Sequence, residues 1–362
     1  MLKIIHAADF HLDSPFSGLS PEQAALRREE QRALLDRLAD LANEEQADLV
    51  LLAGDLLDSG RLYRETAQTL AQTLSRIRAR VFIAPGNHDP YCVSSPYTLP
   101  IWPDNVHIFS SPRPAGVDLD ELGCTVYGAA FLQEQADTAP LDGFCAPDDG
   151  RIHLMVLHAN TEGAGYAPIS PAQIAGSGLD YLALGHIHQS SGLMKHGRTF
   201  WAYPGCPEGR GFDELGEKGV LVLEVDQDTV SGRFVPLCRR RYEIVSVDLT
   251  GCNQPLAAVE SALPAGTGQD IYRILLTGEF PMDAATLAAL EQALTPRFWS
   301  VALQDRTRTP TDLWSRAAED SLAGLFLQIM QPLCRQSPDD EPLQLAVRYG
   351  LAALENGEDV AP

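Results

Sequence analysis

Residues 49–58 read LVLLAGDLLD and residues 81–90 read VFIAPGNHDP. Each stretch begins with a continuously apolar run, which is typical of a strand buried on both faces of a parallel sheet. Glycine interrupts each run, and acidic, amide or imidazole side chains follow at once. Because open α/β sheets bind ligands outside the carboxyl ends of their strands, we expect Asp55, Asn87 and His88 to meet in one crevice, with Asp55 at its centre.

The segments around these two strands predict alternating strands and helices. A strand is expected over residues 2–8, and a capping box at Ser20 with a following proline predicts a helix that ends near Asn43. Residues 63–77 predict a second helix. This β-α-β-α-β order indicates a parallel sheet with right-handed crossovers.

Three further apolar runs end in side chains that can bind metal: Asp9 and His11, then His158, then His186 and His188. A single histidine at a strand end is more often an ordinary polar residue than a metal ligand, but five such endings together favour a metal centre. The candidates suffice for two divalent ions that share a bridging ligand, and they are Asp9, His11, Asp55, Asn87, His158, His186 and His188. The other histidines, apart from His88, are not expected to touch metal, namely His6, His107, His153 and His196.

Charge and cysteine content narrow the function. The 362 residues carry a formal net charge of −22, which argues against nucleic-acid binding through overall charge, since such binding relies on Lys and Arg at the phosphates. The single run of basic residues, 239–241, either contacts substrate or lies on a solvated strand edge. Seven scattered cysteines without a CxxC motif suit a reducing compartment, and no stretch is apolar enough to span a membrane. We expect a soluble cytoplasmic protein.

The complete set of motifs resembles the calcineurin-like metallophosphoesterase superfamily over residues 1 to about 210, through DxH (Asp9, His11), GD (Gly54, Asp55), GNHD (Gly86 to Asp89), His158 and GHIH (Gly185 to His188). The opening KIIHAADFHLDSPF and the segment GDLLDSG are most similar to the bacterial DNA repair exonuclease branch, relatives of the nuclease subunit of the double-strand-break repair complex.

The resemblance implies roles for these positions. One metal ion would be held by Asp9, His11 and His188. The other would be held by Asn87, His158 and His186, with Asp55 bridging the two ions. Imidazole and carboxylate ligands without thiolate fit manganese, iron or zinc, and the resemblance makes manganese the first choice.

Three polar residues beside the predicted ligands carry further expectations. His88 would act on the phosphate as the catalytic residue, and Asp89 either orients His88 or caps a turn. Some members of the repair-nuclease branch have a second catalytic histidine where this chain has Asp58, and we expect Asp58 to be a plain loop residue. Arg210 is expected to be an ordinary surface arginine rather than a phosphate contact.

The predicted fold class is α/β, with a metallophosphoesterase-type β-sandwich core flanked by helices, a small α+β cap domain and a helical C-terminal tail. Residues 1–245 form the predicted nuclease domain, and residues 199–211 within it have a loop-like composition. Residues 246–306 form the cap, and residues 307–362 form an acidic helical segment. The apolar face within residues 313–333 either packs on the cap or binds a partner.

The predicted function is a two-metal phosphodiesterase, a DNA exonuclease or endonuclease of DNA repair in which a metal-bound hydroxide attacks the phosphodiester. The resemblance implies a large coiled-coil ATPase as partner and is compatible with a homodimer. Two alternatives stay open: a small-molecule or cyclic-nucleotide phosphodiesterase or phosphatase, which suits the acidic surface, and a non-catalytic regulatory subunit.

Overall fold

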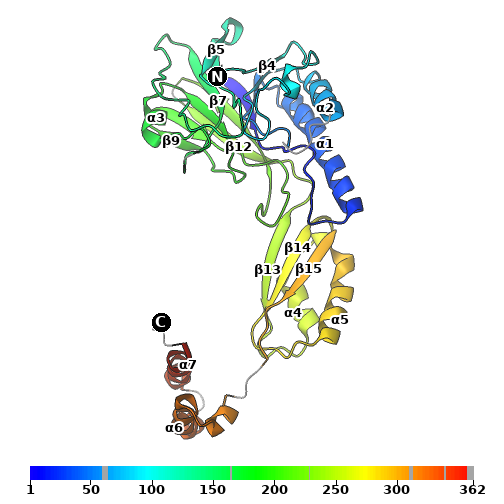
Figure 1. Ribbon diagram of the computed structural model, residues 1–362, viewed down its shortest axis with the longest axis vertical. Helices are drawn as coiled ribbons and strands as arrows, with labels where there is room; N and C mark the ends of the chain where they lie inside the picture. The colour runs from blue at the N-terminus through cyan, green and yellow to red at the C-terminus, as the bar shows by residue number, and fades with distance from the viewer. Residues whose placement is uncertain (59–63, 164, 228, 310–312, 338–339, 357–362) are drawn as a thin grey trace. The chain divides into compact units, whose positions relative to one another are not determined.

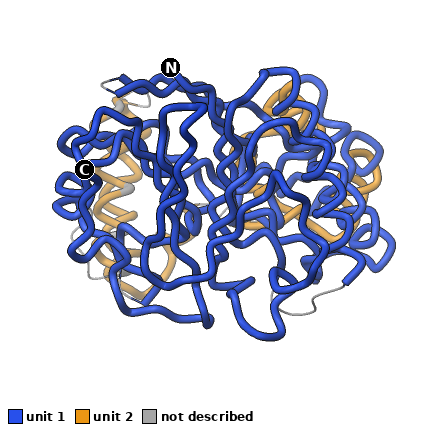
Figure 2. Tube along the Cα trace, turned by 90° about the horizontal axis from the view of Figure 1, so that it is seen from above, with its two compact units in different colours: residues 1–244, 265–273, 295–302 blue, residues 245–264, 274–294, 303–362 orange. Residues whose placement is uncertain are grey.

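The computed structural model describes residues 1–58, 64–163, 165–227, 229–309, 313–337 and 340–356 (Figure 1). The chain divides into two compact units, coloured separately in Figure 2. The first comprises residues 1–244, 265–273 and 295–302, and the second comprises residues 245–264, 274–294 and 303–362. Tyr63, the predicted start of the second helix, lies outside the described residues.

The first sheet of the first unit has six strands in the order β12-β11-β1-β2-β3-β4. Strands β1 to β4 run parallel, whereas β11 pairs antiparallel with both β1 and β12. The predicted parallel arrangement of the first three strands is therefore confirmed. The strands are β1 (Leu2–Ala7), β2 (Leu49–Leu52), β3 (Arg80–Ile83), β4 (Val106–Ile108), β11 (Gly219–Val225) and β12 (Val230–Pro236).

The second sheet also has six strands, in the order β5-β6-β7-β8-β10-β9, and its four central strands are parallel. The loop expected from residue 199 onward is wrong at its start, because Phe200 and Trp201 extend β10 alongside β8, as aromatic residues favour. The strands are β5 (Ala115–Leu119), β6 (Cys124–Gly128), β7 (Ile152–His158), β8 (Tyr181–Gly185), β9 (Met194–His196) and β10 (Thr199–Ala202).

The two sheets pack face to face, and helices cover their outer faces. Alternate residues of β1 to β3 point into the core between the sheets, and the residues between them pack against α1 (Pro21–Glu44) and α2 (Arg64–Leu74). The outer face of the second sheet packs against α3 (Pro171–Gly176). Figure 1 shows α1 and α2 on one side of the sheets and α3 on the other. The predicted sandwich and the capping box at Ser20 are confirmed.

A three-stranded sheet, β13-β14-β15, follows, and the boundary between the units runs through its strands. It is accompanied by α4 and α5, and then by α6 and α7, which pack on each other around Leu327 and Val347. The bounds are β13 (Tyr242–Asp248), β14 (Ile271–Thr277), β15 (Ser300–Asp305), α4 (Pro255–Ala262), α5 (Ala284–Leu294), α6 (Leu322–Gln336) and α7 (Glu341–Asn356).

The basic run at 239–241 is largely consumed inside the protein. Arg240 is buried and bonds Glu30 at 2.6 Å, and Glu30 in turn accepts a bond from Arg27 at 2.8 Å. Arg241 pairs with Asp270 at 2.7 Å. A buried charge needs such a partner, so Arg240 forms neither the expected substrate contact nor a solvated edge.

One polar pair links the two sheets through their shared core. His6 of β1 is fully buried and accepts a hydrogen bond from the Tyr181 hydroxyl at 2.8 Å through Nδ1, while its Nε2 donates to the Leu184 carbonyl at 3.1 Å. Both ring nitrogens are satisfied in the neutral form. Burial therefore lowers the pKa of His6 from 6.5 to about 3.

We expect His6 to make the protein sensitive to mild acid. The unfolded chain takes up a proton on this residue below its ordinary pKa, whereas the folded chain does not, so stability is complete above that pKa and falls as the pH drops toward the folded value. Between about pH 7.5 and about pH 5.5 the loss from this residue is about 1.4 kcal/mol. Urea unfolding of metal-free protein at both pH values should show a smaller decline for His6→Gln, and equal declines would contradict the assignment.

Candidate metal centre

The carboxyl ends of strands from both sheets meet at one edge of the sandwich. The backbone N–H of Asp9 donates to the Gly54 carbonyl at 3.0 Å, and that of His11 donates to the Asp55 carbonyl at 2.9 Å. His158, at the end of β7, donates from Nδ1 to the Ala53 carbonyl at 2.9 Å. These bonds bring the loops after β1, β2 and β7 into one crevice, as the sequence predicted.

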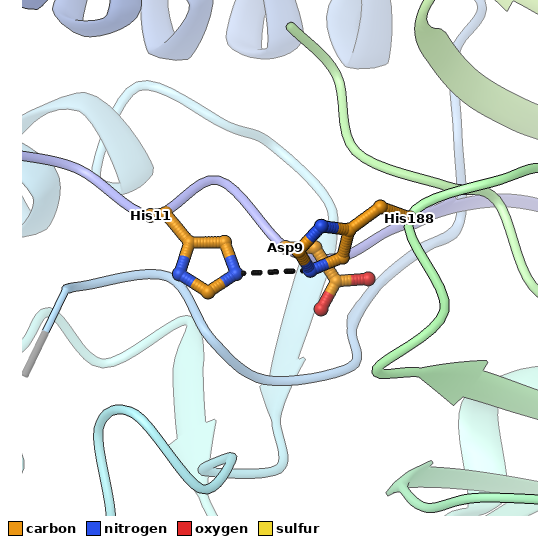
Figure 3. A group of neighbouring side chains, drawn as sticks. All are labelled: Asp9, His11 and His188. Atoms are coloured by element: carbon orange, nitrogen blue, oxygen red, sulfur yellow. Dashed lines mark hydrogen bonds between the residues drawn. The ribbon is translucent and has the colours of Figure 1, made fainter. Parts of the chain in front are cut away.

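Asp9, His11 and His188 form one tight cluster (Figure 3), whose nearest ligand atoms lie within 4.8 Å of one another. The two imidazoles face each other, with 3.2 Å between the Nε2 atom of His11 and that of His188. Asp9 and His11 are buried, and within the described chain the Nδ1 atom of His11 is a buried nitrogen without a hydrogen-bond partner. Facing nitrogens beside a buried carboxylate suit a shared cation.

Asp55 lies between this cluster and a second group of predicted ligands. Its carboxylate is 3.7 Å from Nε2 of His11 and 3.3 Å from Nε2 of His158. The same His158 nitrogen is 2.9 Å from the side-chain oxygen of Asn87. Asp55 therefore contacts histidines from both predicted ligand sets, which is the position required of a bridging residue.

His186 is tied to the centre through its backbone. Its N–H donates to both Asp9 carboxylate oxygens, at 3.1 and 3.2 Å, and its ring centroid is 5.2 Å from that of His158. The ring also lies 4.8 Å from Tyr166. Within the described chain, no cluster of three His, Cys, Asp or Glu ligand atoms within 4.8 Å includes His186, so this ring lies farther from its predicted partners than the others.

Backbone strain is concentrated at this centre. Asp9, His11, Asp55 and His186 have φ angles of +56°, +45°, +51° and +111°, in the region that favours glycine. Such conformations persist only where the surrounding structure imposes them, and they gather at functional sites. The strain places four predicted ligands where regular strands would not direct them.

The pKa values reflect buried negative charge among crowded imidazoles. Burial raises the pKa of Asp9 to about 6. Burial alone would lower the pKa of His158, but its attraction to Asp55 and Asp9 raises that pKa to about 9. Burial and repulsion by His158 lower the pKa of His186 to about 4. Two buried carboxylates thus require positive charge in the centre, and their nitrogen and oxygen donors fit a divalent metal ion.

His88 and Asp58 form a pair at the mouth of the crevice, separated by 3.6 Å between Nδ1 and the carboxylate. The hydroxyl of Ser14 donates to the other Asp58 oxygen at 3.0 Å, and the backbone N–H of His88 donates to Asp55 at 2.8 Å. Asp58 raises the pKa of His88 above its usual value. The expectation of a plain loop residue at Asp58 is wrong, because this carboxylate contacts the predicted catalytic histidine.

Sequence reasoning missed Glu214. Its carboxylate accepts a bond of 2.6 Å from Nδ1 of His188, which leaves Nε2 of His188 directed toward His11. Arg210 donates to the same carboxylate at 2.9 Å and is partly buried, so it is not an ordinary surface arginine. A carboxylate behind a metal-binding histidine fixes its tautomer and orientation, but Glu214 stands in no motif that could have revealed it.

Asp89 binds the loops together from beneath. Its carboxylate accepts backbone N–H bonds from Gly86, Asp55, Leu56 and Leu57 at 2.7 to 3.1 Å, and a bond of 2.6 Å from the hydroxyl of Tyr97. Of the two roles considered for Asp89, capping of backbone groups is the one observed.

Comparison with known proteins agrees with this geometry. Residues 2–190 match the calcineurin-like phosphoesterase family, and the chain belongs to that family. It is 30% identical over 360 residues to the uncharacterized metallophosphoesterase YhaO of Bacillus subtilis, covering 91% of this chain and 87% of that protein.

Two relatives with named functions are more distant. One of the proteins that make up the nuclease SbcCD of Bacillus subtilis is 25% identical over 267 residues, or 62% of this chain and 66% of that protein. The DNA double-strand break repair protein Mre11 of Aeropyrum pernix is 26% identical over 326 residues, or 84% and 74%.

Family membership makes this chain a metallophosphoesterase, a hydrolase that binds divalent metal ions. It also shows that the resemblance inferred from the motifs is correct. In the described parts of the chain, none of the helices has the length and apolar character needed to cross a membrane.

Removal of the Asp89 carboxylate should destabilise the protein strongly. Asp89→Ala leaves four backbone N–H groups and the Tyr97 hydroxyl without their buried acceptor, which we expect to cost at least about 3 kcal/mol of unfolding free energy. Tyr97→Phe removes a single bond and should cost about 1 kcal/mol. Chemical denaturation of both variants measures the difference, and similar losses would show that the backbone bonds to Asp89 contribute little.

Proposed function

We propose that this chain is a two-metal phosphodiesterase that cleaves DNA, an exonuclease or endonuclease of DNA repair. The observation that carries the proposal is the gathering of Asp9, Asp55, His11, His158 and His188 in one crevice, with His88 at its mouth. A bridging carboxylate between two histidine groups is what a pair of metal ions requires.

In this proposal Asp9, His11 and His188 hold one ion, Asn87, His158 and His186 hold the other, and Asp55 bridges them, with manganese preferred over iron or zinc. When bound, two such ions neutralise the phosphoryl oxygens and supply a water of lowered pKa. Glu214 holds Nε2 of His188 toward Asp9 and His11, and the Ala53 carbonyl does the same for His158.

The chain's own proton chemistry is assigned to His88. Asp58 stands opposite Nδ1 and favours a protonated ring, which leaves Nε2–H free to donate to the leaving oxygen or to the charge that grows on the phosphoryl group. Ser14 fixes the Asp58 carboxylate, so the pair is oriented before substrate arrives. Arg210 bonds Ser14 at 3.5 Å and adds positive charge on this side of the crevice.

Support for DNA as substrate comes from the two relatives named as a nuclease and as a break-repair protein. The net charge of −22 and the internal use of Arg240 support the alternative of a small phosphodiester substrate. A DNA-cleaving form therefore needs positive charge from elsewhere. A vestigial site in a regulatory subunit is the least supported reading, because every predicted ligand is present.

A coiled-coil ATPase is the proposed source of that charge. Four apolar residues on α6 are exposed at spacings of three and four, namely Leu322, Leu325, Ile329 and Leu333, a pattern that suits helix-in-groove binding. We also propose the division into residues 1–245, a cap at 246–306 and a C-terminal segment at 307–362. A cytoplasmic location suits seven free cysteines.

Substitutions at His88 and Asp55 should separate catalysis from metal binding. His88→Ala should lower turnover about 10²- to 10⁴-fold and leave the metal content nearly intact, because His88 faces Asp58 rather than the ions. Asp55→Asn should abolish turnover and reduce the metal content. Plasma mass spectrometry with steady-state rates tests both, and loss of metal from His88→Ala or a full rate in that variant would refute its assigned role.

The substrate can be settled with end-labelled linear DNA. In the presence of manganese we expect nucleotide release that disappears in Asp55→Asn, measured beside hydrolysis of bis(4-nitrophenyl) phosphate. Turnover of the small diester with DNA untouched, both alone and with the native partner added, would favour the small-substrate alternative. Full metal occupancy without turnover of either would favour a regulatory subunit.

A further inference from the structure

A cavity of about 480 Å³ lies beside the metal centre. Its walls come mainly from residues 129–140, the loop that follows β6, and it reaches Leu157 and His158 at the end of β7. Since Nε2 of His158 is 3.3 Å from Asp55, a molecule in this cavity touches the ring that borders the reacting phosphate. The mechanism above assigns no role to this space.

The lining of the cavity selects the chemistry of its occupant. Nine of the fourteen lining residues are apolar, and among those described there is neither lysine nor arginine. The cavity therefore offers no partner for a phosphate, and its Asp137 repels one. The polar side chains include the carboxamides of Gln133 and Gln135, which can donate and accept hydrogen bonds at the edge of a base.

The inner wall is formed before any substrate binds. Phe131 is buried and its ring meets that of His158 edge-on, with centroids 5.6 Å apart. Its backbone donates to Pro85 at 3.0 Å and accepts from Tyr91 at 2.7 Å. Farther along the loop, Ala136 pairs with the strand-like segment at Tyr166. A fixed apolar cleft of this size, with a few polar groups, is typical of a small-molecule site.

We propose that this cavity binds the nucleobase of the nucleotide whose phosphate is cleaved, an inference that rests on the phosphodiesterase function proposed above. A planar, uncharged heterocycle matches an apolar slot with carboxamides at its rim, and contact with His158 places it one nucleotide unit from the metals. A base can enter only when it is unstacked and unpaired, so frayed or single-stranded ends are the preferred substrates.

A neighbouring cavity of about 540 Å³ limits the site to one base. It shares Asp137 and Thr138 with the first cavity and adds Asp142 to the wall. Carboxylates repel the phosphates that a continuing strand would carry. The remainder of a nucleic acid therefore leaves the crevice in another direction.

The first test compares two activated diesters in manganese, thymidine 5′-(4-nitrophenyl phosphate) and bis(4-nitrophenyl) phosphate. We expect kcat/KM to favour the thymidine ester at least about tenfold, in line with stacking energies for single bases. Leu132 lines the cavity and is exposed, so Leu132→Trp narrows the slot without disturbing the core. The ratio of the two kcat/KM values should fall about tenfold in this variant.

Leu26→Trp is the matched control, since Leu26 is similarly exposed on α1 and lies outside the cavity. A wild-type ratio near one, or equal ratios in wild type and Leu132→Trp, overturns the nucleobase assignment while leaving the phosphodiesterase intact. Failure to cleave either diester refutes the proposed function instead.

A second measurement decides the inference without turnover. Single-stranded DNA with a terminal 2-aminopurine should change its fluorescence on binding Asp55→Asn protein, and Leu132→Trp added to that background should abolish the change. An unchanged signal in the double variant overturns the assignment.

Discussion

Two carboxylates with almost no contact with water, those of Asp9 and Asp55, set the terms for the rest of the structure. Their charge cannot be buried without compensation, and the nearest compensation is imidazole from His11, His158 and His188. Those rings come from strands of both sheets, so the sandwich must bring its strand ends together at one edge. The hydrogen bonds between the loops and the left-handed backbone at Asp9 and Asp55 are the means by which it does so.

Much of this arrangement could be predicted from local sequence. Continuous apolar runs identified β1, β2, β3, β7 and β8, and the polar residue after each run identified the crevice, because strand direction alone carries those side chains to one edge. Residues whose role depends on distant partners could not be found this way. Glu214 reaches His188 across 26 positions, and Asp58 reaches His88 across 30, and neither pairing leaves a periodic trace. β10 was missed because its pairing with β8 outweighed the Pro- and Gly-rich composition that follows it.

The charge distribution separates the chemistry from the capture of substrate. Positive charge near the centre is held in pairs, Arg210 with Glu214 and Arg241 with Asp270, and the adjoining cavity is apolar or acidic. Such a surface recognises a phosphate through metal ions and an organic group through shape, and gains little from the polyanionic character of a long strand. This is the physical basis for assigning the gathering of DNA to another protein and its cleavage to this one.

Asp89 shows that the two central loops are one mechanical part. Its single side chain is the acceptor for the turn that begins at Asp55 and for the turn that contains His88, so neither loop has a conformation of its own to keep. Anyone transplanting this centre into another β-sandwich would have to move residues 54–58, residues 85–89 and Tyr97 as a set. Evolution faces the same restriction: insertions can accumulate in the outer loops, whereas the spacing within these two cannot drift independently.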